Sequence, residues 1–458
     1  DHRDLHKEYR RQRQMCIRDR KWENLLSLKR QGDSLKRLRS EQDETRVGFD
    51  VDYDRIVFSS FFRTLQDKTQ VVPFSKTSFV HTRLTHSLEV SVVGRSLGRT
   101  VGQHILNKYP YLNQTHGFQV NDFGSIVAAA CLAHDIGNPP FGHSGESAIG
   151  DFFKIGEGEK YKLELTKLQY NDLCNFEGNA NGFKILTESK IGSPGGLRLS
   201  YATLGAFTKY PKASLPYKPT KKIKDKKYGF FSNQFDFFDE VASELGLKVG
   251  DSNYNRHPLA YLVEAADDIC YTLIDFEDGI NLDWIPEEFA LEYLVKLVKD
   301  TIDKEKYSKM GLKSQRIAYL RALAINTLIN EAVNIYLENE ENILNGSFEK
   351  SLMSTSKFKA QMDGIIDISV EKVYKSKEVI EKELTGYKVL HFLLKTFTSS
   401  VINWRDDKVS AFDELALECI PKEYLNKDTD LYSSLLDVSC FIASLTDGLA
   451  LEWYKKLS

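Results

Sequence analysis

The sequence contains 458 residues, of which 41% are hydrophobic and 28% are charged, a composition typical of globular proteins with a substantial core. Its formal net charge of −3 gives no overall attraction to nucleic acid or to a membrane surface, so an anionic ligand must be bound by a local basic cluster. The six cysteines are far apart and include no C-x-x-C pair, which disfavours a disulfide framework or a zinc ribbon and favours a reducing, cytoplasmic location.

The amino-terminal segment 1–20 carries six arginines and no hydrophobic periodicity. We therefore expect a disordered or foreign extension in preference to a nucleic-acid-binding arm. The segment has no apolar h-region, which argues against a secretory signal. The run from Ile126 to Ala133 is apolar but far too short to span a bilayer, so no membrane partner is expected.

From Lys21 onward the sequence has helical periodicity and few strand signals, which predicts an all-α fold. No Gly/Ser-rich or Pro-rich linker divides it, so one composite helical unit is favoured over separate domains. Within that unit, residues 21–290 are predicted to form the core, with a Lys-rich insertion near 207–230. Residues 291–458 are predicted to be a C-terminal helical region packed on that core.

The first long helix is predicted over residues 83–106, with an apolar side marked by Leu88, Val92 and Leu97. The next is predicted over residues 122–135, with Asp122 as a plausible N-cap. Its body is apolar on all sides, so this helix should be buried.

His134 and Asp135 end this buried helix, where an unpaired carboxylate would be costly and a divalent cation would remove the cost. A His-Asp pair alone is weak evidence, because such a pair is usually an ordinary helix C-terminal turn. His86 lies in the first turns of the preceding predicted helix and offers a second imidazole. Two imidazoles with two carboxylates can neutralise a divalent ion, as in many hydrolytic metal sites.

A third helix is predicted from residue 259 to about residue 280. Asp267, Tyr271 and Asp275 are spaced at i, i+4 and i+8, so they share one face. Asp268 is turned by about 100° from Asp267, and the spacing alone leaves open which of the two carboxylates faces the metal. Tyr271 could equally be a core residue, and Asp275 could belong to a solvated acidic helix end.

Further candidates surround these helices. His143 precedes Glu146 by three residues, so the two can share a helical turn and position a proton donor. Arg83 lies three residues before His86, where its planar fork could hold two phosphate oxygens beside a metal. Residues 209–227 carry eight lysines, a pattern more typical of a solvated loop than of a site.

Six strings in this sequence resemble those of the HD-domain deoxynucleoside triphosphate triphosphohydrolases, the bacterial dGTPase family. They follow the family's order, and only the first 20 residues fall outside the resemblance. The strings are TLQDKTQVVP (64–73), TRLTHSLEV (82–90), AHDIGNPPFGHSGE (133–146), FEGNANGFKIL (176–186), VEAADDICY (263–271) and SLTDGLALEWYKKL (444–457).

The resemblance implies a role for individual residues. The implied metal ligands are His86, His134, Asp135 and Asp267, and the choice of Asp267 over Asp268 comes from the resemblance alone. The implied catalytic pair is His143 and Glu146. The positions implied to touch the nucleotide are Gln70, Arg83, Lys209, Tyr271 and Asp275. Asn138 stands where some relatives carry another histidine, a departure from their pattern.

The implied activity is hydrolysis of dGTP, or of dNTPs more broadly, to the deoxynucleoside and tripolyphosphate. Mn²⁺ or Mg²⁺ is the expected ion, with Fe²⁺, Co²⁺ and Zn²⁺ as alternatives. The resemblance also suggests a homo-oligomer, a hexamer or tetramer, with single-stranded DNA or a dNTP as a possible effector. Two alternatives remain open: an HD 5′-deoxynucleotidase acting on dNMPs, and an inactive HD sensor that binds dNTP or single-stranded DNA.

Overall fold

The computed structural model describes residues 21–71, 80–189 and 195–458, so the predicted extension at 1–20 lies outside the described residues. The described residues are mainly helical. Their strands are limited to β1 (Lys248–Gly250) and β2 (Asn253–Tyr254), which form a small antiparallel hairpin. The predicted all-α fold is confirmed.

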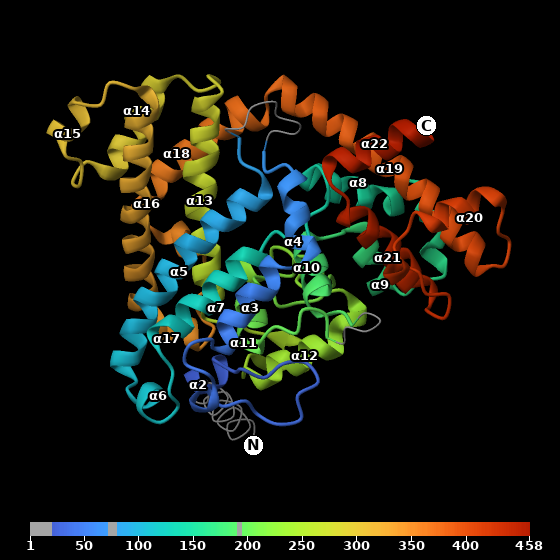
Figure 1. The fold of residues 1–458 in the computed structure, drawn as a ribbon, viewed down its shortest axis with the longest axis horizontal. Coiled ribbons are helices and arrows are strands. Elements are labelled where there is room, and N and C mark those ends of the chain that lie inside the picture. Colours follow the sequence, from blue (N-terminus) through green and yellow to red (C-terminus); the bar gives the residue numbers. More distant parts are fainter. Residues whose placement is uncertain (1–20, 72–79, 190–194) are drawn as a thin grey trace, which may run out of the picture.

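The helices are joined by turns and by longer loops, of which residues 26–47 and 208–234 form two (Figure 1). The amino-terminal and central α-helices are α2 (Trp22–Leu25), α3 (Gly48–Val57), α4 (Ser60–Thr64), α5 (Arg83–Lys108), α6 (Tyr111–Gln114), α7 (Val120–Ala133), α8 (Gly142–Lys154), α9 (Lys167–Cys174), α10 (Gly178–Thr187), α11 (Tyr201–Phe207), α12 (Phe235–Glu244) and α13 (Ala260–Asn281). The later α-helices are α14 (Glu287–Val298), α15 (Lys304–Ser308), α16 (Lys313–Glu338), α17 (Glu340–Leu344), α18 (Lys359–Ser369), α19 (Lys377–Arg405), α20 (Ala411–Glu418), α21 (Leu431–Ser444) and α22 (Asp447–Leu457). The 3₁₀ segments are η1 (Arg39–Glu41), η2 (Leu65–Asp67), η3 (Glu157–Leu163), η4 (Ile223–Asp225), η5 (Ser232–Gln234), η6 (Met353–Thr355) and η8 (Lys422–Tyr424), and the π-helical turn η7 (Val370–Tyr374) follows α18.

Two clusters of buried apolar side chains hold the helices together. The larger cluster lies where α5, α7, α13 and α16 pack against one another, on one side of Figure 1. The second lies on the other side, where α8 and α9 meet α19, α21 and α22. Helices from the predicted C-terminal region thus contact the predicted core in both clusters, and the division near residue 290 stays a prediction.

The carboxy-terminal helices α21 and α22 are apolar but separated by a sharp bend. Within the described ranges, no single helix has the length and apolar composition needed to cross a membrane. Only α21 and α22 taken together meet that test by length and composition, and they are bent by 110° at their junction.

The contact between α5 and α7 is unusually close because glycines occupy it. A Cβ on Gly94 would lie 2.4 Å from the sulfur of Cys131, and one on Gly98 would lie 2.6 Å from the carbonyl oxygen of Phe123. The predicted apolar side of this helix is wrong at Leu88 and Val92, which are exposed, and correct at Leu97, which is buried. The buried face combines the glycines with apolar residues at helical spacing, among them Val90, Leu97 and Val101.

The buried helix α7 begins earlier than predicted. Its N-cap is Gln119, and Asp122 lies three residues further on. The Asp122 carboxylate accepts hydrogen bonds from the Gln119 N–H at 2.8 Å and from Arg39 Nε at 2.8 Å. Asp122 therefore acts as the third residue of the first turn that reaches back to the cap, and its prediction as the N-cap is wrong. The body of α7 is buried on all sides, as predicted.

Replacing Gly98 with alanine tests the close contact between α5 and α7. Because the added methyl group would overlap a backbone oxygen of α7, Gly98→Ala should lower the free energy of unfolding by about 1–3 kcal/mol. In an unobstructed helix the same change would stabilise by up to about 1 kcal/mol. Urea unfolding followed by circular dichroism measures the effect. Ser96→Ala, at an exposed position of α5, is the control and should leave the midpoint nearly unchanged. A Gly98→Ala protein as stable as the parent would show that the helices separate without cost.

Candidate functional site

Three of the four predicted metal ligands meet at the junction of three helices. His86 comes from α5, His134 follows the last residue of α7, and Asp267 lies on α13; their donor atoms all lie within 4.8 Å of one another. Asp267 Oδ1 is 3.3 Å from His86 Nε2 and 3.5 Å from His134 Nε2. The two histidines are buried and Asp267 is half-buried, so the group is a shielded set of nitrogen and oxygen donors that can hold a metal ion.

The His134 ring is oriented by the helix that precedes it. Its Nδ1 lies 2.7 Å from the carbonyl oxygen of Cys131, and a carbonyl oxygen can only accept. Nδ1 therefore carries a proton, so in the neutral ring Nε2, on the side of Asp267, is the nitrogen that can bind a metal. A backbone carbonyl that fixes the tautomer in this way is the usual second partner of a metal-binding histidine.

The fourth predicted ligand, Asp135, lies at the edge of this group. Its Oδ1 is 3.5 Å from His134 Nε2 and accepts a hydrogen bond from Asn138 Nδ2 at 2.5 Å. Its Oδ2 accepts from Arg83 Nη1 at 2.5 Å. Although burial opposes ionisation, Arg83 and His134 hold the pKa of Asp135 below its usual range, so the group is a carboxylate. Asn138, where some relatives carry histidine, thus supports Asp135.

Asp267 is held as an anion by a similar ion pair. Lys209 Nζ lies 2.6 Å from Asp267 Oδ2. Burial again opposes ionisation, but Lys209 and His134 hold the pKa of Asp267 well below its usual value. Two predicted substrate-binding cations, Arg83 and Lys209, therefore lie directly against two predicted metal ligands.

The predicted catalytic pair lies in the first turn of α8, as its spacing predicts. His143 Nδ1 is 2.7 Å from Glu146 Oε2, and Glu146 Oε1 accepts a hydrogen bond from the Gly178 N–H at 2.7 Å. Although burial opposes ionisation, Lys227 and His143 lower the pKa of Glu146, so it is a carboxylate anchored at both oxygens. The His143 side chain is 82% exposed, so its Nε2 is accessible to a ligand.

A cavity of about 500 Å³ opens beside this pair. Its lining includes His143 and Glu146 together with lysines of the Lys-rich loop, but not the three clustered metal-ligand candidates. Lys227 Nζ lies 2.9 Å from Glu177 Oε1 and 3.9 Å from Glu146 Oε2. Although burial opposes the charge, these two carboxylates raise the pKa of Lys227. Sequence reasoning missed Lys227, because eight lysines in one loop favour a solvated segment and do not distinguish one of them.

Tyr271 and Asp275, two further predicted substrate positions, face the turn η7. The Tyr271 ring stacks on the Tyr374 ring, with centroids 5.9 Å apart and planes inclined by 12°. The Tyr374 hydroxyl donates a hydrogen bond to Asp275. Asp275 is 1% exposed, and burial raises its pKa to about 8, so the alternative of a solvated helix end is wrong. Tyr374 was not predicted, because it lies about a hundred residues away in a segment without a motif.

Gln70, the last predicted substrate position, lies just before the second gap in the described chain. The adjoining residues pair with the start of α5: Lys68 O accepts from the Arg83 N–H at 3.1 Å. Gln70 Oε1 is buried and has no hydrogen-bond partner within the described part of the chain. Asp447 at the start of α22 accepts from the backbone N–H groups of Thr69 and Phe141, each at 3.1 Å. Four of the recognised strings therefore meet here, although the last two residues of the first string lie outside the described residues.

Comparisons with known proteins identify the family. Residues 83–175 match the HD domain family. A deoxyguanosinetriphosphate triphosphohydrolase-like protein of Synechocystis is 41% identical over 449 residues, which cover 95% of this chain and 98% of the relative. This chain belongs to the deoxyguanosinetriphosphate triphosphohydrolase family. A deoxyguanosinetriphosphate triphosphohydrolase-like protein of Pseudomonas aeruginosa is 36% identical over 445 residues, which cover 95% of this chain and 98% of the relative. The deoxyguanosinetriphosphate triphosphohydrolase of Klebsiella pneumoniae is 30% identical over 419 residues, which cover 82% of this chain and 81% of the relative. The resemblance is confirmed, and the chain is a hydrolase of this family.

The two adjacent aspartates of α13 allow a matched test of the metal group in this hydrolase. We expect Asp267→Ala to lose most of the bound divalent metal, because Asp267 Oδ1 faces both imidazoles. Asp268→Ala removes the same group one position further round the helix and should retain the metal. Metal per chain, measured by mass spectrometry after loading and desalting, decides the point. Equal loss in the two variants would contradict this assignment.

Proposed function

We propose that this chain hydrolyses deoxynucleoside triphosphates, dGTP among them, to the deoxynucleoside and inorganic tripolyphosphate. The observation that carries the proposal is the direct contact between two phosphate-binding cations, Arg83 and Lys209, and two metal-ligand candidates, Asp135 and Asp267. The Klebsiella relative, which is named a deoxyguanosinetriphosphate triphosphohydrolase, supports it. The homo-oligomeric assembly, the cytoplasmic location and the effectors suggested by the resemblance belong to the same proposal.

The metal site in this proposal consists of His86, His134 and Asp267, with Asp135 as the fourth ligand. Two imidazole nitrogens and two carboxylates suit Mn²⁺ or another transition ion better than Mg²⁺, which prefers oxygen donors. The hydrogen bond from His134 Nδ1 supports the fit, because it leaves Nε2 as the ring nitrogen that can bind a metal when the ring is neutral. Such an ion polarises a phosphate oxygen and lowers the pKa of the attacking water.

Arg83 and Lys209 bind the phosphate chain in this proposal. A divalent ion carries the same total charge as these two cations, so it can replace them as the partner of the two carboxylates. Both cations then remain available to phosphate oxygens beside the reacting atom. The planar guanidinium of Arg83 suits two oxygens at once, whereas the Lys209 ammonium acts as a point charge.

His143 supplies the proton in this proposal. Water attacks the α-phosphorus and loses a proton to solvent, the bond to the 5′-oxygen breaks, and the leaving oxygen takes a proton from Nε2 of the protonated His143, which solvent then reprotonates. Glu146 is a positioning residue, because its carboxylate binds the opposite ring nitrogen and is itself anchored by Gly178. Lys227 in turn holds Glu146 in its charged form.

The nucleoside binds on the α13 and η7 side in this proposal. Tyr271 and Tyr374 offer aromatic faces, and stacking of a base on such a face typically contributes about 1–3 kcal/mol. Asp275 Oδ1 and Gln70 Oε1 are buried acceptors without a partner among the described residues. A hydroxyl of the deoxyribose is a donor that could satisfy one of them.

Product identity tests the proposed reaction. The metal-loaded protein should convert each accepted dNTP to its deoxynucleoside and tripolyphosphate in equal amounts, because the bond that breaks lies between the α-phosphorus and the 5′-oxygen. Chromatography of reactions with each dNTP, with GTP and with dGMP separates the possible products. Orthophosphate or pyrophosphate as the first product would exclude this mechanism, and a preference for dGMP would indicate the nucleotidase alternative.

The role of His143 distinguishes an enzyme from a dNTP sensor. His143→Ala should lower kcat about 10²-fold or more while metal content and dNTP affinity stay nearly unchanged, because the proton is transferred only in the transition state. Steady-state kinetics and equilibrium binding measure the two quantities. His104→Ala, an exposed histidine of α5, is the control and should retain full activity. Loss of metal in His143→Ala, or an unchanged kcat, would return His143 to a ligand or structural role.

A further inference from the structure

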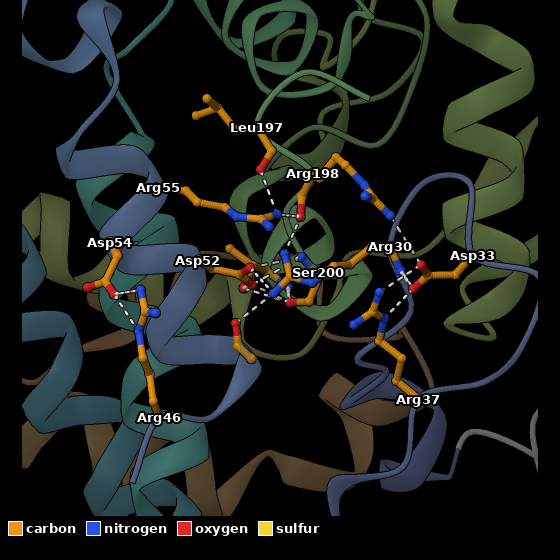
Figure 2. Close-up of polar contacts among 12 residues, drawn as sticks. Arg30, Asp33, Arg37, Arg46, Asp52, Asp54, Arg55, Leu197, Arg198 and Ser200 are labelled. Carbon is orange, nitrogen blue, oxygen red and sulfur yellow. Dashed lines mark hydrogen bonds and ion pairs between the residues drawn. The ribbon is translucent and has the colours of Figure 1, made fainter. Parts of the chain in front are cut away.

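A second cavity, of about 140 Å³, lies between the loop after α2, the helix α3 and the turn before α11 (Figure 2). One water needs about 10–15 Å³ of such space, so the cavity can hold a larger group. Its lining is dominated by arginines that come from three separate parts of the chain: Arg30, Arg37, Arg46, Arg55 and Arg198. None of these residues belongs to the candidate metal site or to the cavity beside His143.

The five arginines share only three carboxylate partners. The pairs are Asp52 with Arg30 at 2.7 Å, Asp54 with Arg46 at 2.7 Å, and Asp33 with both Arg37 at 2.5 Å and Arg198 at 3.3 Å. Arg55 instead donates to the carbonyl oxygens of Leu197 at 3.0 Å and Arg198 at 2.6 Å, and forms no ion pair with a carboxylate in the described ranges. The cavity therefore has an excess of two positive charges.

Arg30 and Arg55 form a fixed base for this cavity. The Arg30 side chain is 5% exposed, and its guanidinium binds Asp52 and the carbonyl oxygen of Gly48. Burial, together with the nearby charge of Arg30, lowers the pKa of Arg55, as expected in a region with too few anions. Arg198 has φ of +48°, a left-handed conformation that is costly for a non-glycine residue and persists only where its surroundings enforce it. That turn directs the Arg198 carbonyl oxygen at both base arginines.

The remaining arginines form an accessible rim. The side chains of Arg37, Arg46 and Arg198 are 42%, 62% and 38% exposed, so their guanidinium groups reach solvent while lining the cavity. Figure 2 shows them on different sides of the Asp52–Arg30 pair. In the structure these groups bind Asp54 on one side and Asp33 on the other, so a phosphate group, whose oxygens accept hydrogen bonds on all sides, would compete with those carboxylates for them.

We propose that this arginine pocket is a second phosphate-binding site, and that it takes a small polyphosphate anion. The anion is either free tripolyphosphate or the phosphate chain of a nucleotide, since both present the same oxygens. One part of this proposal rests on the proposed function: the expectation that this protein itself produces tripolyphosphate. Binding of phosphate in the pocket does not require hydrolysis.

Calorimetric titration of the full chain with tripolyphosphate tests the pocket. A chelator in the buffer prevents hydrolysis, so failure of the proposed reaction does not affect the measurement. The double variant Arg37→Gln, Arg46→Gln should weaken one class of binding sites roughly tenfold or more, the effect of losing a charge-assisted hydrogen bond. Higher salt should weaken binding to the parent protein as well. Arg316→Gln removes the same charge and an ion pair with Glu287 elsewhere, and should bind like the parent.

Further measurements separate the possible ligands. Equal affinity for tripolyphosphate and dGTP would show that the phosphate chain alone is recognised, whereas tighter binding of dGTP would show that the nucleoside also contributes. Arg46→Gln alone, at the most exposed position, provides a second variant if the double variant proves unstable. Identical binding by parent and variants would overturn the proposal. So would binding of a single-stranded oligonucleotide through these arginines with no binding of tripolyphosphate.

Discussion

Glycines on one face of α5 bring its backbone against α7, and the positions of the buried histidines depend on this contact. His86 lies near the start of α5 and His134 at the end of α7, and their ring centroids are 5.2 Å apart. A larger residue at Gly94 or Gly98 would push the helices apart and separate the rings. Because α13 packs on both helices, the same contact also sets the distance to Asp267. Helix packing therefore sets the positions of His86, His134 and Asp267 relative to one another, more than any single loop does.

The second constraint on the site is electrostatic. Two carboxylates, the buried Asp135 and the half-buried Asp267, stay charged because the cations Arg83 and Lys209, together with His134, lie against them. Buried charges without partners are costly, so carboxylates and cations must be placed together for the helices to pack. In the proposed reaction the same arrangement would have a second use, because the two cations would bind phosphate and the two carboxylates would bind the metal. Stability of the apoprotein and affinity for the ligands therefore depend on the same four side chains.

The sequence predicted the parts of the site that follow local rules. The helical spacing that joins His143 to Glu146 needs only the geometry of one turn, and that contact is present. Contacts between distant segments could not be obtained in this way. Tyr374 reaches Tyr271 from a segment without a motif, and Lys227 is one of eight lysines in its loop. The exposed position of Leu88 follows from helix geometry, because Leu88 and the buried Leu97 are nine residues apart and so lie on opposite faces of α5.

A single short helix connects the arginine pocket to the candidate metal site. Asp52, which binds Arg30 in the pocket, also accepts hydrogen bonds from the N–H and hydroxyl of Ser200, the N-cap of α11. The seven residues of α11 span about 10 Å, and Lys209 follows the helix by two residues. A shift of the α11 cap would therefore be transmitted along a rigid element to the ion pair with Asp267. Because packed helices shift as units and do not deform continuously, an anion that reorganises the ion pairs around Asp52 would act on the same element that positions Lys209.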